Sequence, residues 1–184
     1  MSIAPTQRSE LHQLARESIE LALRQGELVP YAGELADPEL NLPSASFVTL
    51  RVGEDLRGCC GTIEPARPLS EDVWNNAWAS AFADPRFPPL TSDEWSGTNI
   101  EISVLSQPER LEVGSEAELL AILRPGQDGL ILQYGTRRST FLPAVWEQLP
   151  EPAAFVRHLK MKAGWPADFW PPDMQAWRYT TESF

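Results

Sequence analysis

The stretch FVTLRVGEDLRGCCGTI, Phe47 to Ile63, alternates apolar and polar residues on both sides of a short turn. Val48, Leu50 and Val52 share one face of an extended strand, because side chains in a strand point alternately to its two faces. Gly53-Glu54-Asp55 supplies turn residues, and the segment that follows reads as a partner strand. The stretch therefore predicts a β-hairpin and, with it, an antiparallel sheet.

Helical patterns flank this hairpin in the sequence. The segment from Ser9 to Gln25 repeats apolar residues at helical spacing and is followed by Gly26, a residue suited to a left-handed C-terminal cap. A second amphipathic pattern begins at Ser70, which is placed to cap it. Trp74 and Trp78 lie in its apolar stripe, and we expect both side chains to be largely buried.

The rest of the chain continues with short elements that pair locally. They are a strand at Ile100 to Leu105, a helix from Ser115 to Leu123, two strands joined at Gly135-Thr136, helical turns beginning at Pro143 and Pro152 with Gly164 ending the second, and a last strand at Gln175 to Thr180. Locally paired strands separated by isolated helices favour an α+β fold, with an antiparallel sheet flanked by helices, over a doubly wound parallel fold.

Charge and hydropathy exclude several classes of partner. Asp and Glu outnumber Lys and Arg by 26 to 15, which gives a net charge of −11 and predicts no affinity for nucleic acid. The sequence contains no uncharged apolar run long enough to span a bilayer and no secretory signal at its start, so we expect a cytoplasmic protein without a membrane segment. The two cysteines are adjacent and do not form a disulfide framework.

The candidate chemistry lies in LRGCCGTI, Leu56 to Ile63. Regular alternation would place Arg57 and Cys59 on one face of the strand and Cys60 on the other, where a free cysteine usually packs as a small apolar residue. A guanidinium beside Cys59 would favour its thiolate form. Gly58 and Gly61 suggest a bulge or the close approach of a ligand or another backbone.

Other residues have a functional interpretation and a structural one. Asp84 and Arg86 could present charges to a ligand or form a local ion pair that fixes the DPRFPP loop. Glu101 and Ser103 could line a cleft or face water, and Lys160 could bind an anion or complement a helix dipole. His12 and His158 have no diagnostic spacing to the cysteines, and we expect no metal site.

Six motifs stand in the order and spacing of the AMMECR domain family, which this chain resembles from about Phe47 onward. They are LRGCCGTI, SAFADPRFPPLTSDEW, IEISVLS, GLIL, TFLPAVWEQ and FVRHLKMKAGWPADFW. The resemblance implies one AMMECR-type domain over residues 1–184, an α+β fold made of a larger and a smaller subdomain that pack closely with a cleft between them. It does not set their boundary.

The resemblance also implies a site and possible partners. The LRGC-x-G signature is the family's suspected functional site and maps to Leu56–Cys59 and Gly61, while Cys60 stands where many members carry isoleucine. In bacteria and archaea such proteins look like component A of the AmmeMemoRadiSam set, alongside a Memo-like protein and a radical-SAM protein. The family has no established activity, and no cofactor is implied.

Two functions remain open at the level of sequence. The chain could be an enzyme or group carrier in which Cys59 is the nucleophile and Arg57 or Arg86 holds a small anionic substrate. It could instead be a non-catalytic binding module or partner subunit that uses the same cleft. We prefer the first, although the missing motif histidine counts against it, because a thiol nucleophile usually needs an adjacent base.

Overall fold

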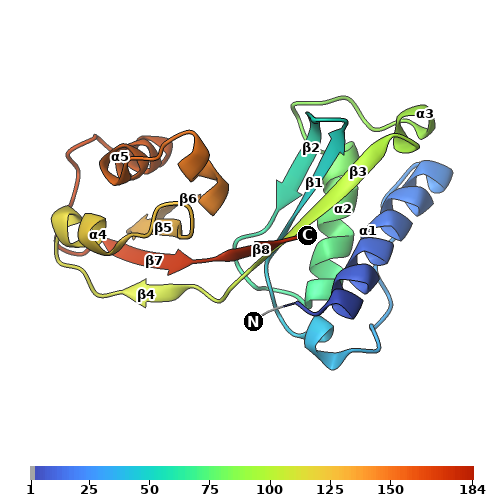
Figure 1. Cartoon of the computed structure of the whole chain (residues 1–184), viewed down its shortest axis with the longest axis horizontal. Helices are drawn as coiled ribbons and strands as arrows, with labels where there is room; N and C mark the ends of the chain where they lie inside the picture. Colours follow the sequence, from blue (N-terminus) through green and yellow to red (C-terminus); the bar gives the residue numbers. More distant parts are fainter. Residues whose placement is uncertain (1–2) are drawn as a thin grey trace. The chain divides into compact units, whose positions relative to one another are not determined.

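Two antiparallel four-stranded sheets organise the residues that the computed structural model describes, 3–184 (Figure 1). The chain divides into two compact units, and each has its own hydrophobic core. The first unit runs up to Ser106 and includes Glu182–Phe184, and the second is Gln107–Thr181. The predicted α+β class is confirmed. That the two units form one closely packed domain with a cleft stays a prediction.

The first unit is a sheet with its helices on one face. The strand order is β2-β1-β3-β8, and α1 and α2 lie together against one side of the sheet (Figure 1). The elements are α1 (Pro5–Gln25), η1 (Pro38–Asn41), β1 (Ser46–Val52), β2 (Asp55–Gly61), α2 (Leu69–Phe82), α3 (Ser92–Trp95), β3 (Thr98–Leu105) and β8 (Thr181–Ser183). The predicted hairpin is β1 and β2, and both neighbours of β1 run antiparallel to it.

The turn of this hairpin follows from its glycine. Val52 pairs with Asp55, so the loop between the strands contains two residues, Gly53 and Glu54. Gly53 has a φ of 60°, whereas no residue other than glycine has a positive φ in residues 3–184. A positive φ at the first loop position alone is the type II′ pattern, whose twist matches that of the flanking strands. Gly135 at 58° begins the corresponding two-residue loop of the β5–β6 hairpin.

Both predicted helices are present, with different starts. α1 begins at Pro5, four residues before the predicted Ser9, and Gly26 closes it at a φ of 83°. The prediction that Ser70 caps α2 was wrong. The helix begins at Leu69 after Pro68, and the Ser70 hydroxyl donates to Asn41 Oδ1 instead.

The core of the first unit lies between the sheet and its helices. Val48 and Leu50 of β1 and Ile102 of β3 are fully buried against apolar residues of α1 and α2. Trp74 is buried as predicted and donates its indole N–H to the Val29 carbonyl. The same prediction holds only in part for Trp78, which is partly buried.

The second unit is a smaller sheet with a core of its own. Its strand order is β4-β7-β5-β6, and Leu130, Leu132 and Phe155 lie within its core. Its elements are β4 (Glu109–Leu111), α4 (Glu116–Ile122), β5 (Gly129–Tyr134), β6 (Arg137–Phe141), η2 (Pro143–Glu147), α5 (Pro152–Lys162) and β7 (Gln175–Tyr179). The predicted hairpin and last strand are confirmed as β5–β6 and β7. The short strands β4 and β8 were not predicted, because three residues carry no readable alternation.

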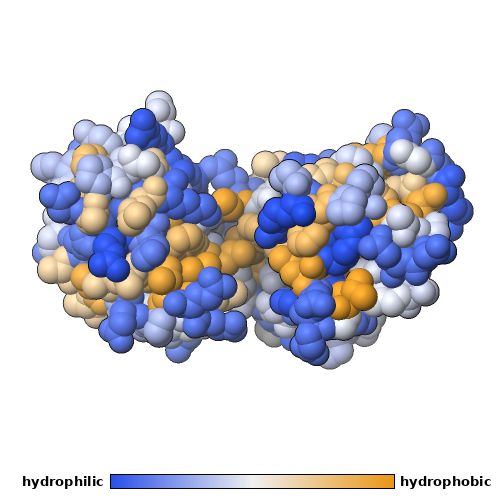
Figure 2. Space-filling model, turned by 90° about the horizontal axis from the view of Figure 1, so that it is seen from above, coloured by the Kyte–Doolittle hydropathy of each residue, from blue (hydrophilic) through white to orange (hydrophobic). Residues whose placement is uncertain are grey.

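Polar residues cover much of the visible surface, with hydrophobic patches among them on both units (Figure 2). In residues 3–184 the large hydrophobic side chains that are exposed are Leu42, Val52, Leu56, Ile122 and Met161. None of the described helices combines the length and apolar character needed to cross a membrane.

The close approach of β2 to α2 gives a stability prediction. A Cβ at Gly58 would lie 2.0 Å from the Ser80 carbonyl oxygen, a backbone atom that cannot move aside cheaply. We expect Gly58→Ala to lower the free energy of unfolding by about 2–3 kcal/mol, measured by urea denaturation. Gly97→Ala is the control, since its Cβ would meet nothing nearer than 3.9 Å, and it should cost less than about 0.5 kcal/mol. Equal losses for the two variants would contradict this account.

Candidate functional site

A β-bulge at Arg57 decides the geometry of the LRGCCG motif. Leu50 pairs with Gly58 and Arg51 with Leu56, so Arg57 is an extra residue in β2 with no partner on β1. A bulge shifts the alternation of side chains by one position. Arg57 therefore turns to the side of α2 and α3, together with Gly58, instead of sharing a face with Cys59. The expectation that Arg57 and Cys59 lie on one face was wrong for this reason.

Arg57 is buried and bound by the loop that follows α2. Its Nε donates to Glu94 Oε1 at 2.8 Å, and its Nη2 donates to the Pro88 carbonyl at 2.9 Å and to Glu94 Oε2 at 3.2 Å. Only 8% of the residue is exposed, and its buried Nη1 has no hydrogen-bond partner in the described part of the chain. Arg57 is thus a buried cation that pairs with the partly exposed Glu94.

Glu94 is held in its charged form by this pair. The Arg57 guanidinium, with the backbone N–H and the hydroxyl of Thr91, lowers the pKa of Glu94 to about 2. Thr91 and Glu94 also form the capping box of α3, in which the Thr91 hydroxyl accepts from the Glu94 N–H. The capping motif is visible in the sequence, but its role as the anchor for Arg57 is not.

Cys59 lies on the outer face of the first sheet, defined here as the face turned away from α1 and α2. Its side chain is half-buried, and its Sγ accepts a hydrogen bond from the Thr49 hydroxyl at 3.4 Å. Thr49 pairs with Cys59 on one side and with Glu101 on the other, so the three residues form a row across β2, β1 and β3. Glu101 is exposed in this row.

Asp84 and Arg86 bind the backbone of Cys59 at the outer edge of β2. Asp84 Oδ2 accepts from the Cys59 N–H at 2.9 Å, and Arg86 Nη2 donates to the Cys59 carbonyl at 3.3 Å. The two side chains pair with each other at 2.7 Å, and this contact holds the pKa of Asp84 well below its usual range. The loop thereby satisfies polar groups that an edge strand leaves unpaired.

The guanidinium at Cys59 is consequently that of Arg86. Its side chain is 54% exposed, whereas the Asp84 side chain is 3% exposed. Arg86 uses Nε and Nη2 for the Asp84 carboxylate and the Cys59 carbonyl, while Nη1 makes no hydrogen bond with residues 3–184. Arg86 thus unites the two interpretations drawn from the sequence: it fixes the loop and still presents a charge.

Cys60 faces α2, as alternation predicts, but it is not fully enclosed. Its backbone N–H donates to the Ser80 hydroxyl at 2.8 Å, while its side chain is only partly buried because β2 is an edge strand. Burial raises the pKa of the Cys60 thiol, and the charge of Asp84 adds to this effect. The two cysteines therefore differ in environment, and a raised pKa disfavours the reactive thiolate form of Cys60.

The remaining candidates of the first unit lie along the same sheet. Gly58 and Gly61 give room to the Ser80 backbone and to the Phe47 ring respectively, so the close approach expected there is made by the protein itself. The hydroxyl of Ser103 is 2.8 Å from that of Ser183, which joins β3 to β8 on the outer face. A binding role for these residues stays a prediction.

Lys160 and the histidines lie elsewhere. Lys160 belongs to the second unit, where its fully buried ammonium donates to Glu116 Oε2 at 2.6 Å. His12 lies on α1, stacked edge-on against Phe184, and burial lowers its pKa. His158 lies on α5 in the second unit. In residues 3–184 no group of three His, Cys, Asp or Glu side chains is placed to hold a metal ion.

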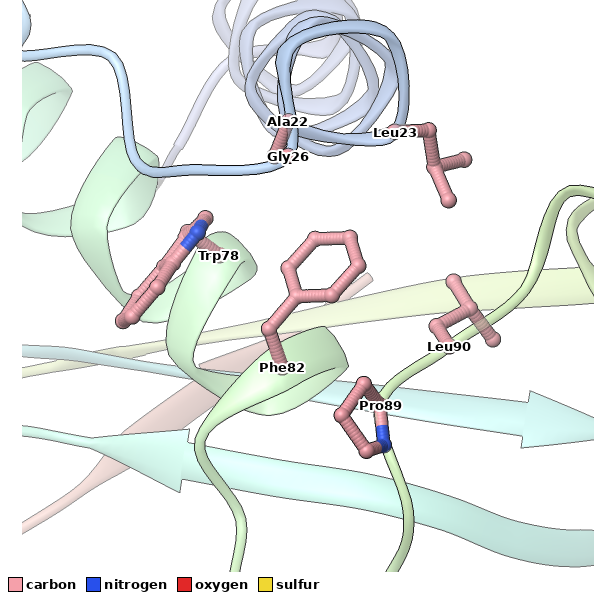
Figure 3. A pocket seen from close by; sticks show the side chains of 7 residues that line it. All are labelled: Ala22, Leu23, Gly26, Trp78, Phe82, Pro89 and Leu90. Carbon is pink, nitrogen blue, oxygen red and sulfur yellow. The ribbon is translucent and has the colours of Figure 1, made fainter.

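The loop that binds Cys59 also borders an apolar hollow of about 390 Å³ on the helical side (Figure 3). Trp78 and Phe82 line it from the end of α2, and Pro89 and Leu90 line it from the loop. Figure 3 shows the Phe82 ring between Trp78 and these two loop residues. The end of α1 forms the rest of the lining, with Ala22, Leu23 and Gly26.

Comparisons of the sequence and of the fold with known proteins point to one family. Residues 12–184 match the family model AMMECR1. A protein of Methanothermobacter thermautotrophicus is 37% identical over 189 residues, covering 100% of this chain and 98% of its own. Protein MJ0810 of Methanocaldococcus jannaschii is 37% identical over 156 residues, which cover 80% of this chain and 76% of its own. The crystal structure of an uncharacterized protein, PH0010 of Pyrococcus horikoshii, superposes with a TM-score of 0.83 at 34% identity, covering 95% of this chain and 88% of the other.

The buried Arg57–Glu94 pair predicts a cost for removing the arginine. We expect Arg57→Ala to lower the free energy of unfolding by about 2 kcal/mol, less than for a fully buried pair because Glu94 is 38% exposed. Arg51→Ala, which removes an exposed guanidinium with a single 3.4 Å contact to the Glu54 carbonyl, is the matched control and should be nearly neutral. Chemical denaturation measures both. A neutral Arg57→Ala would mean that the ion pair is not structural.

The same pair predicts a loss of stability in acid. The pKa of Glu94 is lower in the folded protein than its ordinary value of 4.5, so folding favours the charged form. This contribution is complete above pH 4.5 and disappears as the pH falls through about 2. Glu94→Gln should therefore reduce the difference in unfolding free energy between pH 5 and pH 2.5, measured by denaturant titration at each pH. If Glu94→Gln and the unaltered protein lose the same unfolding free energy between these two pH values, Glu94 is not the source of the acid sensitivity.

Proposed function

The chain belongs to the AMMECR1 family, and the names of the relatives given above assign no activity. From the geometry of the site, we propose that the protein binds a small anionic ligand beside Cys59 and that the Cys59 thiol is the reactive group. The observation that carries the proposal is the position of Cys59. Cys59 is partly buried on the outer face, its sulfur accepts a hydrogen bond from a hydroxyl, and its backbone is held by a loop that presents a guanidinium.

The clamp supports a positioned thiol. Hydrogen bonds from the loop fix both the N–H and the C=O of Cys59, while Thr49 orients its sulfur from the neighbouring strand. Residues on fixed strands hold reacting groups more accurately than residues on loops. Cys59 can therefore present its sulfur in one direction. Cys60, on the opposite face of the same strand, lacks this arrangement.

Arg86 supports an anionic ligand. It replaces Arg57 as the residue that would bind the anion, because the Arg57 guanidinium is buried and already neutralised by Glu94. The half-exposed Arg86 keeps Nη1 available, and a planar guanidinium suits a carboxylate or phosphate. In a group transfer the thiolate sulfur would supply the electron pair for the new bond, and the leaving group would depart with its own pair.

A non-catalytic binding module is the alternative. It is favoured by the absence of a histidine base at Cys59 within the first unit, where His12 packs against Phe184 on the helical side. In that case the outer face would hold a ligand or a partner subunit, and the Memo-like and radical-SAM proteins suggested by the resemblance are the partners that we propose to test. A cytoplasmic location likewise stays a prediction.

The test compares two alkylating reagents of nearly equal size. Iodoacetate carries a negative charge and iodoacetamide does not, and both react with the same thiolate. The ratio of their rates is therefore independent of the fraction of thiolate. We expect Cys59 to be alkylated before Cys60 in the folded protein, as read by mass spectrometry of the peptides. We also expect Arg86→Gln to lower the ratio of iodoacetate to iodoacetamide rates at Cys59 roughly threefold or more at low salt.

Two further variants sharpen this result. Arg24→Gln removes the same charge from the last turn of α1 and should leave the ratio unchanged. Arg86→Lys keeps the charge and should retain most of the preference for iodoacetate. The proposal fails if Cys59 is as inert as Cys60 in the folded state. The proposal that Arg86 binds an anion fails if Arg86→Gln leaves the ratio of iodoacetate to iodoacetamide rates unchanged. The binding-module alternative then accounts better for the site.

A further inference from the structure

A second hollow lies entirely within the second unit, at the turn of the β5–β6 hairpin. Its volume is about 450 Å³, within the range of small-molecule sites. Tyr134, Gly135, Thr136 and Arg137 line it from the hairpin. The opposite wall is the segment after α5, Gly164–Pro166 with Phe169. None of the lining residues is acidic.

Aromatic rings form the walls of this hollow. The Tyr134 and Phe169 rings meet edge to face with their centroids 5.3 Å apart, and the Trp165 and Phe169 rings stack at 5.8 Å. Trp165 is 6% exposed, so the stack is anchored in the core of the unit. These rings can contact a planar aromatic ligand either by stacking or edge to face.

Residues that line the hollow also carry hydrogen-bond donors that the protein does not use. The exposed Arg137 guanidinium, the Tyr134 hydroxyl and the Trp165 indole N–H make no hydrogen bond or ion pair with residues 3–184. By contrast, Arg124 and Arg178 of the same unit are both paired with carboxylates. The charge of Arg137 is therefore available to a ligand in the hollow that it lines.

The backbone brings Arg137 to the aromatic wall. Gly164 has a φ of 75°, and a Cβ at this position would lie 3.6 Å from Arg137 Nη1. The glycine that ends α5 therefore adjoins the guanidinium, and Trp165 follows it directly. A cation and a set of aromatic rings are thus held together by two tight turns, one after β5 and one after α5.

We propose that this hollow binds a planar aromatic carboxylate, whose ring packs against Tyr134 and Phe169 and whose anionic group pairs with Arg137. Three unused donors favour an acceptor-rich group, and the positive charge selects an anion. The ring supplies the apolar contact that the walls offer. This site is independent of Cys59, so it stands or falls separately from the function proposed above.

The test uses 2-naphthoate as the probe and follows the amide and indole signals of the ¹⁵N-labelled full chain by NMR. We expect shift changes at Gly135, Gly164 and the Trp165 indole N–H. Neutral 2-naphthamide should bind about tenfold more weakly, because it cannot form the charge-assisted pair. This comparison uses the unaltered protein and so depends on no variant.

Two matched variants locate the charge. Arg137→Gln should weaken 2-naphthoate binding about tenfold and bring it to the level of 2-naphthamide. Arg157→Gln, which removes an exposed arginine of α5 outside the hollow, should change the affinity less than twofold. The proposal is overturned if the shifts appear elsewhere or not at all, if the amide binds as tightly as the carboxylate, or if Arg157→Gln has the same effect as Arg137→Gln.

Discussion

The packing of β2 against α2 at Gly58 is the contact on which the first unit depends. The Ser80 carbonyl occupies the space where any other residue would place its Cβ, so strand and helix approach as closely as backbones allow. Ser80 also accepts the Cys60 N–H and donates to the Val48 carbonyl, which ties α2 to both strands of the hairpin. The bulge beside Gly58 and the loop after α2 are both positioned by this contact.

The bulge separates two residues that are close in sequence. Arg57 becomes a buried structural cation held by Glu94 and the Pro88 carbonyl, while Cys59 stays on the outer face. The loop after α2 binds Arg57 through the Pro88 carbonyl and the Cys59 backbone through Asp84 and Arg86. The loop therefore serves stability and the candidate site at once, and its proline-rich sequence keeps it in one shape.

The two units illustrate different ways of using charge. In the first, the Arg57–Glu94 and Asp84–Arg86 pairs fix the loop beside Cys59, and the exposed side of Arg86 is the basis of the proposed preference for anions. In the second, the buried Lys160–Glu116 pair joins α5 to the start of α4, while Arg137 stays unpaired beside aromatic rings. Arg86 and Arg137 are the two guanidinium groups that adjoin the proposed sites.

The sequence by itself determined the α+β class, the β1–β2 and β5–β6 hairpins and the main helices, because alternation, helical spacing and glycine turns are local signals. It also identified Cys59, Asp84 and Arg86 as candidate site residues. Only the tertiary structure decided that Arg57 pairs with Glu94 and Arg86 adjoins Cys59, since one extra residue in β2 reverses the side-chain alternation that the sequence predicts. The partial exposure of Trp78 and the buried pairing of Lys160 were likewise decided by packing between distant segments, which no local pattern records.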